Sequence, residues 1–541
     1  MTDSPAVRLP LDPAEQPILD RVLEIRDHLS LLKQDRSTYV RAQDVTALYN
    51  QIIEQVEQLN HIRAIGKKRE EQNRVDTVLD DCFQLISLFF LTIGRNQEAP
   101  AVYSAISTVK RLLDHLREAG FYSAKDLESI SKKLVEWQQS VERGKESHSP
   151  QLMTLLEARI DVCRATLYEL QHYLSSLDQA SMGTYEKLVS ILRSLSACNT
   201  KSKVGVPLQE LASPPARHVT ALTNAKYPAA EVNAFQEQLL AMQAELHETN
   251  VRNEDRTAEE DYADRLSQLN IKESSNAEGP KVVSALLARC LLWVEIVQEK
   301  KGTIDPRFKG TYDKLLKIRN ALDAMNITQA WSLRETDLYS YQRQLDRVDE
   351  SRVDGNFIDD EGRPADLHAQ RTLLYLLRKS YAYIYQYIVN SEPVSEALLP
   401  IYNQLLTLRR CLVEVKRAGG VDSPRELYPY SMKLNSIDNM RKDGKFMVGD
   451  DIPEGQGAIT SLLSECFDLA YELRTSAEEK DEEDKETMPE PTPLEEKEAR
   501  INDAIMGVED QQERDGIVPG EEPGLGGYGT VGVNGNGSPA T

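Results

Sequence analysis

Pairs of a tyrosine and a basic residue recur along the chain, and their types and spacing suit the binding of an anion. In each pair the base follows the tyrosine by seven or eight positions, which places both side chains on roughly the same face of a helix. A phenol donor beside a guanidinium fork suits a phosphorylated peptide or another small polyanion. The candidate anion-binding residues are Tyr103, Lys110, Arg111, Tyr185, Arg193, Tyr312, Arg319, Tyr402, Arg409 and Arg410.

The same basic residues have a structural interpretation, which the sequence favours. Acidic residues such as Asp126, Asp337 and Glu426 lie on segments that we expect to form neighbouring helices. Ion pairs with these acids would neutralise the bases and leave no site for a ligand. Both interpretations stay open at the level of sequence.

Clusters of reactive residues with a recognisable local spacing are absent from the sequence. The eight histidines form no His-x-x-x-His pair, and the six cysteines form no Cys-x-x-Cys pair. No catalytic residue, cofactor or metal ligand is therefore predicted, and the cysteines are expected to be reduced core residues. An enzyme whose site is assembled only in three dimensions stays open, and a deep pocket with a titratable pair would favour it.

The charge balance argues against duplex DNA as a direct partner. Among 541 residues, 64 are Lys or Arg and 87 are Asp or Glu, which gives a net charge of −23. Such a chain repels a phosphate backbone on average. The longest apolar stretch, residues 85–93, is shorter than the roughly 20 residues that cross a bilayer. Because the N-terminus shows no secretory signal, we expect a protein of the cytosol or nucleus without a membrane span.

Apolar residues at i, i+3, i+4 and i+7 define the elements that must position these side chains. The spacing recurs in residues 18–32, 155–174, 371–388 and 459–473 and predicts amphipathic helices. No segment shows the period of two that is typical of a strand. The sequence therefore predicts an all-α protein.

Internal repeats indicate how these helices are organised. Helices that begin with a tyrosine recur at Tyr49, Tyr103, Tyr185, Tyr312 and Tyr402, and an apolar helix that often carries a cysteine accompanies them. A third helix of the unit follows the pattern Asp-Leu-x-x-x-x-x-x-Leu. Repeated three-helix units with uneven spacing predict two related multi-helix halves rather than a regular solenoid.

Two Asp-Gly pairs mark the ends of corresponding helices in the repeats. Asp354-Gly355 is followed by Phe357, and Asp443-Gly444 is followed by Phe446. Asp-Gly supplies the positive φ of a tight turn, so we expect the chain to stop and reverse at both places.

The acidic C-terminal region differs in composition from the rest of the chain. From Glu478 onward it has 18 acidic and 5 basic residues, and it cannot bury enough apolar area to fold alone. Its apolar residues between 494 and 506 are spaced as in a helix that forms on a partner, and its Ser and Thr residues are candidate phosphorylation sites. The predicted organisation is a disordered N-terminus at 1–12, helical half one at 13–250, a linker at 251–280, helical half two at 281–475 and a disordered acidic, Gly-rich tail at 476–541.

The duplicated Tyr helix, the turns at residues 354–357 and 443–446, and the helix that contains Leu462-Leu463-Ser464-Glu465-Cys466-Phe467 carry a resemblance. The chain resembles an uncharacterised family of fungal proteins with two copies of a domain of unknown function. The resemblance covers roughly residues 10–475 and implies an intracellular helical protein of fungal origin. It assigns no catalytic residue.

These observations together predict a non-enzymatic interaction or adaptor protein whose partners are other, unidentified proteins. Phosphopeptide or small-polyanion recognition by the Tyr and Arg faces is the alternative function, and an enzyme is the third.

Overall fold

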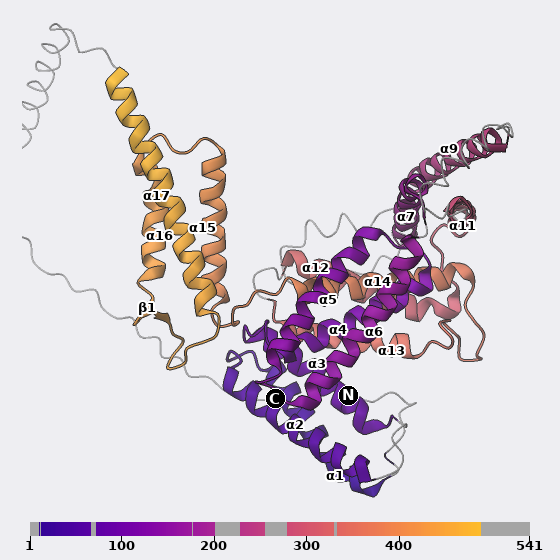
Figure 1. The fold of residues 1–541 in the computed structure, drawn as a ribbon, viewed down its shortest axis with the longest axis horizontal. Helices are drawn as coiled ribbons and strands as arrows, with labels where there is room; N and C mark the ends of the chain where they lie inside the picture. Colours follow the sequence, from indigo (N-terminus) through magenta and orange to yellow (C-terminus); the bar gives the residue numbers. More distant parts are fainter. Residues whose placement is uncertain are drawn as a thin grey trace, which may run out of the picture. The chain divides into compact units, whose positions relative to one another are not determined.

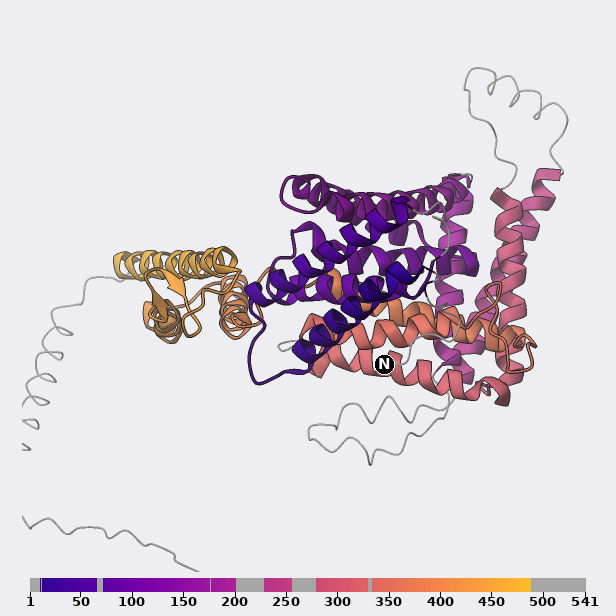
Figure 2. The same ribbon diagram turned by 90° about the horizontal axis from the view of Figure 1, so that it is seen from below.

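The computed structural model describes residues 10, 12–65, 72–175, 177–200, 228–254, 279–328 and 333–487. Helices dominate these residues, which confirms the predicted all-α fold (Figures 1 and 2). The α-helices are α1 (Gln16–Gln34), α2 (Ala42–Ile65), α3 (Arg74–Thr92), α4 (Val102–Ala119), α5 (Ala124–Gly144), α6 (Pro150–Ser175), α7 (Gln179–Asn199), α9 (Ala229–Glu254), α11 (Gly279–Lys300), α12 (Lys309–Thr328), α13 (Leu338–Glu350), α14 (Leu367–Val389), α15 (Leu399–Arg417), α16 (Tyr428–Asp438) and α17 (Gln456–Thr487). Short 3-10 helices are η1 (Pro13–Glu15), η2 (Ala99–Ala101), η4 (Pro306–Phe308), η5 (Glu335–Asp337) and η6 (Pro424–Leu427).

The chain divides into two compact units whose boundaries fall within α15 and α17. The larger unit comprises Met1–Glu414 and Pro429–Ala470, and the smaller unit comprises Val415–Tyr428 and Tyr471–Thr541. In the smaller unit, Lys416 Nζ lies 2.5 Å from Glu472 Oε2, which joins the end of α15 to α17. All of the features discussed below lie in the larger unit.

Two of the predicted domain boundaries fall inside observed helices. The predicted linker begins inside α9, whose backbone is helical as far as Glu254, and residues 255–278 lie outside the described residues. Helix α17 continues past residue 475 to Thr487, so its last turns belong to the region predicted as tail. Residues 1–9 and 488–541 of the predicted disordered ends lie outside the described part of the chain. The division into two halves stays a prediction.

Helix α3 forms the centre of the larger unit. Every residue of its last three turns, 81–92, is buried, and Leu88, Phe89 and Phe90 are almost completely shielded from solvent. It packs against α1, α2, α4 and α13, which explains why this segment has no polar face. The apolar stretch at residues 85–93 is thus a core helix, and none of the described helices is long and apolar enough to span a membrane.

Cysteine-bearing helices pack in the same way on three of the Tyr-led helices. In each pair the thiol faces the backbone carbonyl three residues after the tyrosine, at a sulfur-to-oxygen distance of 3.6 to 3.9 Å. The pairs are Cys163 on Ile106 of α4, Cys290 on Leu188 of α7 and Cys466 on Leu405 of α15. A thiol is a small apolar group with a weak donor, so it fits a close helix crossing.

The two Asp-Gly pairs adopt the predicted turns. Asp354 and Gly355 have φ of 49° and 79°, and Asp443 and Gly444 have φ of 50° and 77°. The second turn joins the two-residue strands β1 (Arg441–Lys442) and β2 (Lys445–Phe446), which pair antiparallel. The sequence did not predict these strands because two residues are too short to show a period of two.

Candidate functional site

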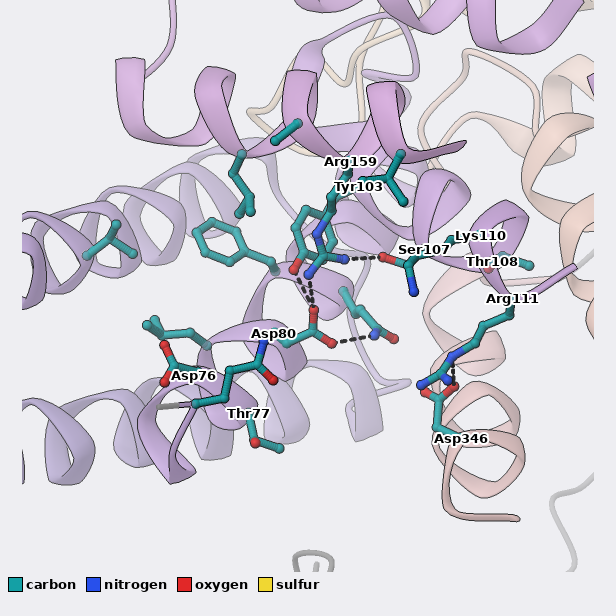
Figure 3. A pocket seen from close by; sticks show the side chains of 18 of the residues that line it. Asp76, Thr77, Asp80, Tyr103, Ser107, Thr108, Lys110, Arg111, Arg159 and Asp346 are labelled. Carbon is teal, nitrogen blue, oxygen red and sulfur yellow. Dashed lines mark hydrogen bonds and ion pairs between the residues drawn. The ribbon is translucent and has the colours of Figure 1, made fainter. Parts of the chain in front are cut away.

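A cavity of about 950 Å³ lies in the larger unit between α2, α3, α4, α6, α13 and α14 (Figure 3). We call it the larger cavity. Its apolar lining comes mainly from α2, α3 and α6, with Leu59, Leu79, Phe83, Leu155 and Val162. Its polar lining comes mainly from α3, α4, α6 and α13. Three exposed residues of α6 at intervals of four, Thr154, Ala158 and Val162, form one border of the cavity. They lie in a row because residues four apart share a helix face.

Asp80 of α3 is the centre of the first polar group in this cavity. Its carboxylate accepts hydrogen bonds from Tyr103 Oη at 2.5 Å, Arg159 Nη2 at 2.7 Å and Gln84 Nε2 at 2.8 Å. Arg159 also donates to Ser107 Oγ at 2.8 Å, and its guanidinium carbon lies 4.4 Å from the centroid of the Tyr103 ring. Figure 3 shows these side chains converging from α3, α4 and α6. Each donor therefore has an acceptor, and the network holds Arg159 in one orientation.

Asp346 of α13 is the centre of the second polar group. It accepts a hydrogen bond from Tyr381 Oη at 2.6 Å, and Arg111 Nε lies 3.8 Å from its Oδ1. Arg111 also approaches Asp349 at 3.1 Å, and His115 Nε2 lies 3.0 Å from the other oxygen of Asp349. One arginine of α4 thereby contacts two carboxylates on successive turns of α13.

Asp346 and Asp349 of α13 differ in the direction of their pKa shifts. Burial raises the pKa of Asp346 to about 6, against the opposing effect of Arg111 and of the hydrogen bond from Tyr381. Burial also acts to raise the pKa of Asp349, but the hydrogen bond from His115, together with the charges of His115 and Arg111, outweighs it and lowers the pKa to about 2. Burial acts on Asp80 in the same direction, but the charge of Arg159 and the hydrogen bonds from Tyr103, Arg159 and Gln84 together outweigh it, so that the pKa of Asp80 is lowered. Asp346 is the one of these three groups that titrates near neutral pH.

The larger cavity contains the first set of predicted anion-binding residues. Tyr103, Lys110 and Arg111 all line it. Their polar groups are engaged with carboxylates: Tyr103 with Asp80, Arg111 with Asp346 and Asp349, and Lys110 with Asp114 at 3.5 Å. The structure thus places these residues at a cavity and gives each of them an acidic partner.

The other predicted sets lie on other helices. Tyr185, Tyr312 and Tyr402 are buried in the core, like Tyr103. Arg193 forms an ion pair with Asp126, a partner named by the structural interpretation. Asp337 pairs with Arg36 rather than with one of the predicted bases.

On α15, Tyr402 donates to Glu392 at 3.0 Å and Arg409 Nε lies 2.7 Å from Glu465 Oε1. Arg410 is exposed. Arg319 of α12 has a buried Nε without a hydrogen-bond partner in the described part of the chain. The structure does not bring the four sets together into one groove.

Sequence reasoning missed Asp80, Arg159, Asp346 and Tyr381. Asp80 and Arg159 are 79 positions apart in the chain and Asp346 and Tyr381 are 35 apart, so no local motif joins them. One signal was available, because Asp80 and Asp81 lie just before the longest apolar stretch of the chain, on the same helix. Carboxylates in such a position need a buried partner.

The described residues contain no group of three or more His, Cys, Asp or Glu side chains that could hold a metal ion.

The fold and the cavity define a helical-repeat protein with an internally paired polar cavity. The chain belongs to the family described as "Protein of unknown function (DUF2408)", whose model matches residues 174–335 and 391–494. A relative from Saccharomyces cerevisiae, "Cu(2+) suppressing and bleomycin sensitive protein 1", is 37% identical over 511 residues, covering 86% of this chain and 91% of the relative. A CUB1 family protein from Schizosaccharomyces pombe is 35% identical over 495 residues, covering 90% of this chain and 98% of that protein. No solved structure matches the chain.

These comparisons confirm the predicted resemblance to a fungal family with a domain of unknown function that matches in two segments.

Proposed function

We propose that the chain is a non-enzymatic adaptor protein of the cytosol or nucleus, which binds a segment of another protein in the larger cavity. The observation that carries this proposal is the pairing of the basic residues that line the cavity. Each has an acidic residue within 4 Å: Arg63 has Asp76, Lys110 has Asp114, Arg111 has Asp346, Arg159 has Asp80 and Arg343 has Asp81.

A wall of paired charges favours an uncharged ligand. A free anion or cation would have to break an existing ion pair, and leaving one partner of a buried pair alone is costly. The remaining contacts are apolar side chains together with amides and hydroxyls such as Asn60, Gln151 and Thr154. Apolar pockets beside fixed donors and acceptors are complementary to a peptide, which offers side chains and backbone amides at once.

The size of the larger cavity also suits a peptide segment. Ligand pockets typically measure about 300 to 1,000 Å³, and this cavity lies at the upper end with about 950 Å³. Its border on α6 is exposed, so a segment can enter without unfolding the core.

A bulky residue at the cavity border tests this proposal. Ala158 is exposed and lines the cavity, whereas Ala165 is exposed on the same helix and does not line it. We expect Ala158→Trp to reduce the binding of a protein partner at least tenfold and Ala165→Trp to leave it unchanged, because only the first indole fills the cavity. Partners recovered with the tagged full-length protein are identified by mass spectrometry, and their affinity for each purified variant is measured by calorimetry.

A photo-crosslinking residue at Thr154 provides an independent measurement. The partner should be crosslinked there and should lose the crosslink in the Ala158→Trp background. Unchanged partner affinity in Ala158→Trp would show that the cavity is not the binding site.

A specific observation supports an enzyme as the second candidate. Asp346 and Tyr381 are a titratable pair on the wall of a deep cavity, and a carboxyl with a pKa near 6 is suited to general acid or base catalysis at neutral pH. Purified protein and the Asp346→Asn variant can be incubated with the small-molecule fraction of a cell extract. A compound that is consumed by the wild type and not by the variant would favour the enzyme over the adaptor.

Anion recognition by the predicted Tyr and Arg faces stays a prediction. The ion pairs of Arg111, Arg193 and Arg409 compete with it.

A further inference from the structure

A second cavity of the larger unit has a different electrostatic character. This smaller cavity of about 280 Å³ lies between the end of α4, α7, α11, α14 and the turn at residues 355–356. Three arginines line it: Arg289 from α11, and Arg371 and Arg378 from α14. Residues 371 and 378 are two turns apart, which places both on one face of α14.

Aromatic rings hold the three guanidinium groups in place. The guanidinium carbon of Arg371 lies 5.1 Å from the ring centroid of Trp293. The guanidinium carbons of Arg289 and Arg378 lie 5.5 Å and 4.8 Å from the same ring, that of Phe121. Stacking on a ring orders an arginine but does not neutralise its charge. The three cations are therefore positioned close to one another around two rings.

In the described part of the chain, none of these three arginines forms an ion pair, although the charge of Asp126 acts on Arg378 from a distance. Nη1 of Arg371 and Nη1 of Arg378 are buried and have no hydrogen-bond partner in the described part of the chain. Arg289 donates to the carbonyl oxygen of Ala119 at the end of α4. Among the described residues that line this cavity, Glu118 is the one with a carboxylate, and it forms an ion pair with Arg352. The smaller cavity thus lacks the ion pairs that neutralise the larger one.

Burial and neighbouring positive charges lower the pKa values of two of these arginines. Burial, with the charge of Arg289 in addition, lowers the pKa of Arg371 to about 10. Burial, with the charge of Arg193 in addition, lowers the pKa of Arg378 to about 10. Both groups stay protonated at neutral pH, so two partly buried like charges, each with one buried nitrogen, have no ion pair among the described residues, an arrangement that a bound anion would relieve.

We propose that the smaller cavity is a binding site for the phosphoryl group of a small soluble molecule, held by Arg289, Arg371 and Arg378. A guanidinium offers two parallel N–H donors that match two oxygens of a phosphoryl group, and several such forks together suit a doubly charged tetrahedral anion. The volume admits a phosphoryl group with a small organic part. The rings of Trp293 and Tyr375 provide apolar surface for that part.

The site is distinct from the predicted anion-binding residues, although two of them lie near it. Arg193 affects the pKa of Arg378, and Arg193 and Arg319 both affect the pKa of Lys379 on the same helix. Asp126 pairs with Arg193 and offsets its charge, so Arg319 is the one of these two bases that adds to the positive potential, which attracts anions before they are bound.

Pyrophosphate and inorganic phosphate are the probes for this site. Calorimetry on the full-length protein should detect pyrophosphate binding, and both anions should raise the melting temperature relative to chloride at equal ionic strength. Substituting Arg371→Met and Arg378→Met together should weaken pyrophosphate binding at least tenfold. Each guanidinium forms charged hydrogen bonds that contribute to affinity, and the variant cannot form them. Arg21→Met on α1 is the control, because that exposed guanidinium is paired with Glu24 and lines neither cavity, and it should bind pyrophosphate as the wild type does.

The melting temperature without anion separates a ligand site from a structural role. If the arginines bind an anion, the double variant without phosphate should melt no lower than the wild type, because two uncompensated buried charges have been removed. A lower melting temperature together with an unchanged response to phosphate would overturn the proposal. Absence of any phosphate or pyrophosphate effect on the wild type would also overturn it. Binding confined to a phosphoserine tripeptide would overturn the assignment to a small molecule.

Discussion

Both cavities of the larger unit are lined by arginine side chains, but the arginines are paired with acids in the larger cavity and lack ion pairs with described residues in the smaller one. In the larger cavity each basic residue has an acid within 4 Å, as Arg159 has Asp80 at 2.7 Å. In the smaller cavity Arg371 and Arg378 lie against Trp293 and Phe121, and one nitrogen of each is buried without a partner. Arginine on a cavity wall is therefore not by itself a signal of anion binding. The signal is the absence of a counter-charge where burial demands one.

The largest expected effect comes from breaking an ion pair in the larger cavity. Asp80→Ala should lower the free energy of unfolding by about 3 kcal/mol, because Arg159 and Tyr103 then lose a shared acceptor. Arg378→Met in the smaller cavity should change it by less than about 0.5 kcal/mol or increase it. Urea unfolding followed by circular dichroism measures both.

A double variant shows whether the loss in Asp80→Ala comes from the orphaned cation. Asp80→Ala combined with Arg159→Met should recover at least half of the lost stability, since the uncompensated charge is then absent. If Arg378→Met were as destabilising as Asp80→Ala, the contrast between the cavities would be wrong.

The pH dependence of stability should distinguish Asp346 from its neighbour Asp349. A carboxyl whose pKa is raised in the folded protein binds a proton more tightly there than in the unfolded chain, so its effect on stability becomes less favourable as the pH rises. With a folded pKa of about 6 for Asp346 and an unfolded pKa of about 4, the wild type should lose about 2 to 3 kcal/mol between pH 4 and pH 6 relative to Asp346→Asn.

Asp349 should show the opposite sign at lower pH. Its pKa of about 2 in the folded protein lies below the unfolded value, so its contribution is present above about pH 4 and is lost as the pH falls toward 2. Unfolding curves of Asp346→Asn and Asp349→Asn across this range test both signs. A profile of Asp346→Asn that runs parallel to the wild type would show that Asp346 is not desolvated.

The sequence predicted the elements of this fold better than its sites. The Asp354-Gly355 and Asp443-Gly444 turns and the core helix at residues 85–93 follow from local residue types, because φ preference and hydrophobic periodicity are local properties. Tyr103 and Arg111 line the larger cavity, and their predicted role in anion binding stays a prediction. Their pairing with Asp80 and Asp346 depends on how α3 and α13 pack against α4, and no local pattern encodes that packing.

The arginines of the smaller cavity were also not predictable as a site from the sequence. Arg371 and Arg378 belong to a segment that was predicted as an amphipathic helix, where an arginine ordinarily faces solvent. Only the packing of α4, α7 and α11 around α14 reveals that one nitrogen of each guanidinium is buried without a hydrogen-bond partner in the described part of the chain. Buried charge is a property of tertiary structure, so a search for local motifs passes over it.

The smallest expected effect compares the two Asp-Gly turns, of which one lines the smaller cavity and the other does not. Gly355 and Gly444 have φ of 79° and 77°, so alanine at either position should lower the free energy of unfolding by about 1 kcal/mol. A Cβ at Gly355 would lie 3.4 Å from Glu118 Oε1, whereas one at Gly444 would meet no atom within 4 Å. Gly355→Ala should therefore also weaken pyrophosphate binding a few fold, and Gly444→Ala should leave it unchanged. Urea unfolding and calorimetry on the two variants measure these effects, and equal pyrophosphate affinities would show that the turn at residue 355 does not shape the site.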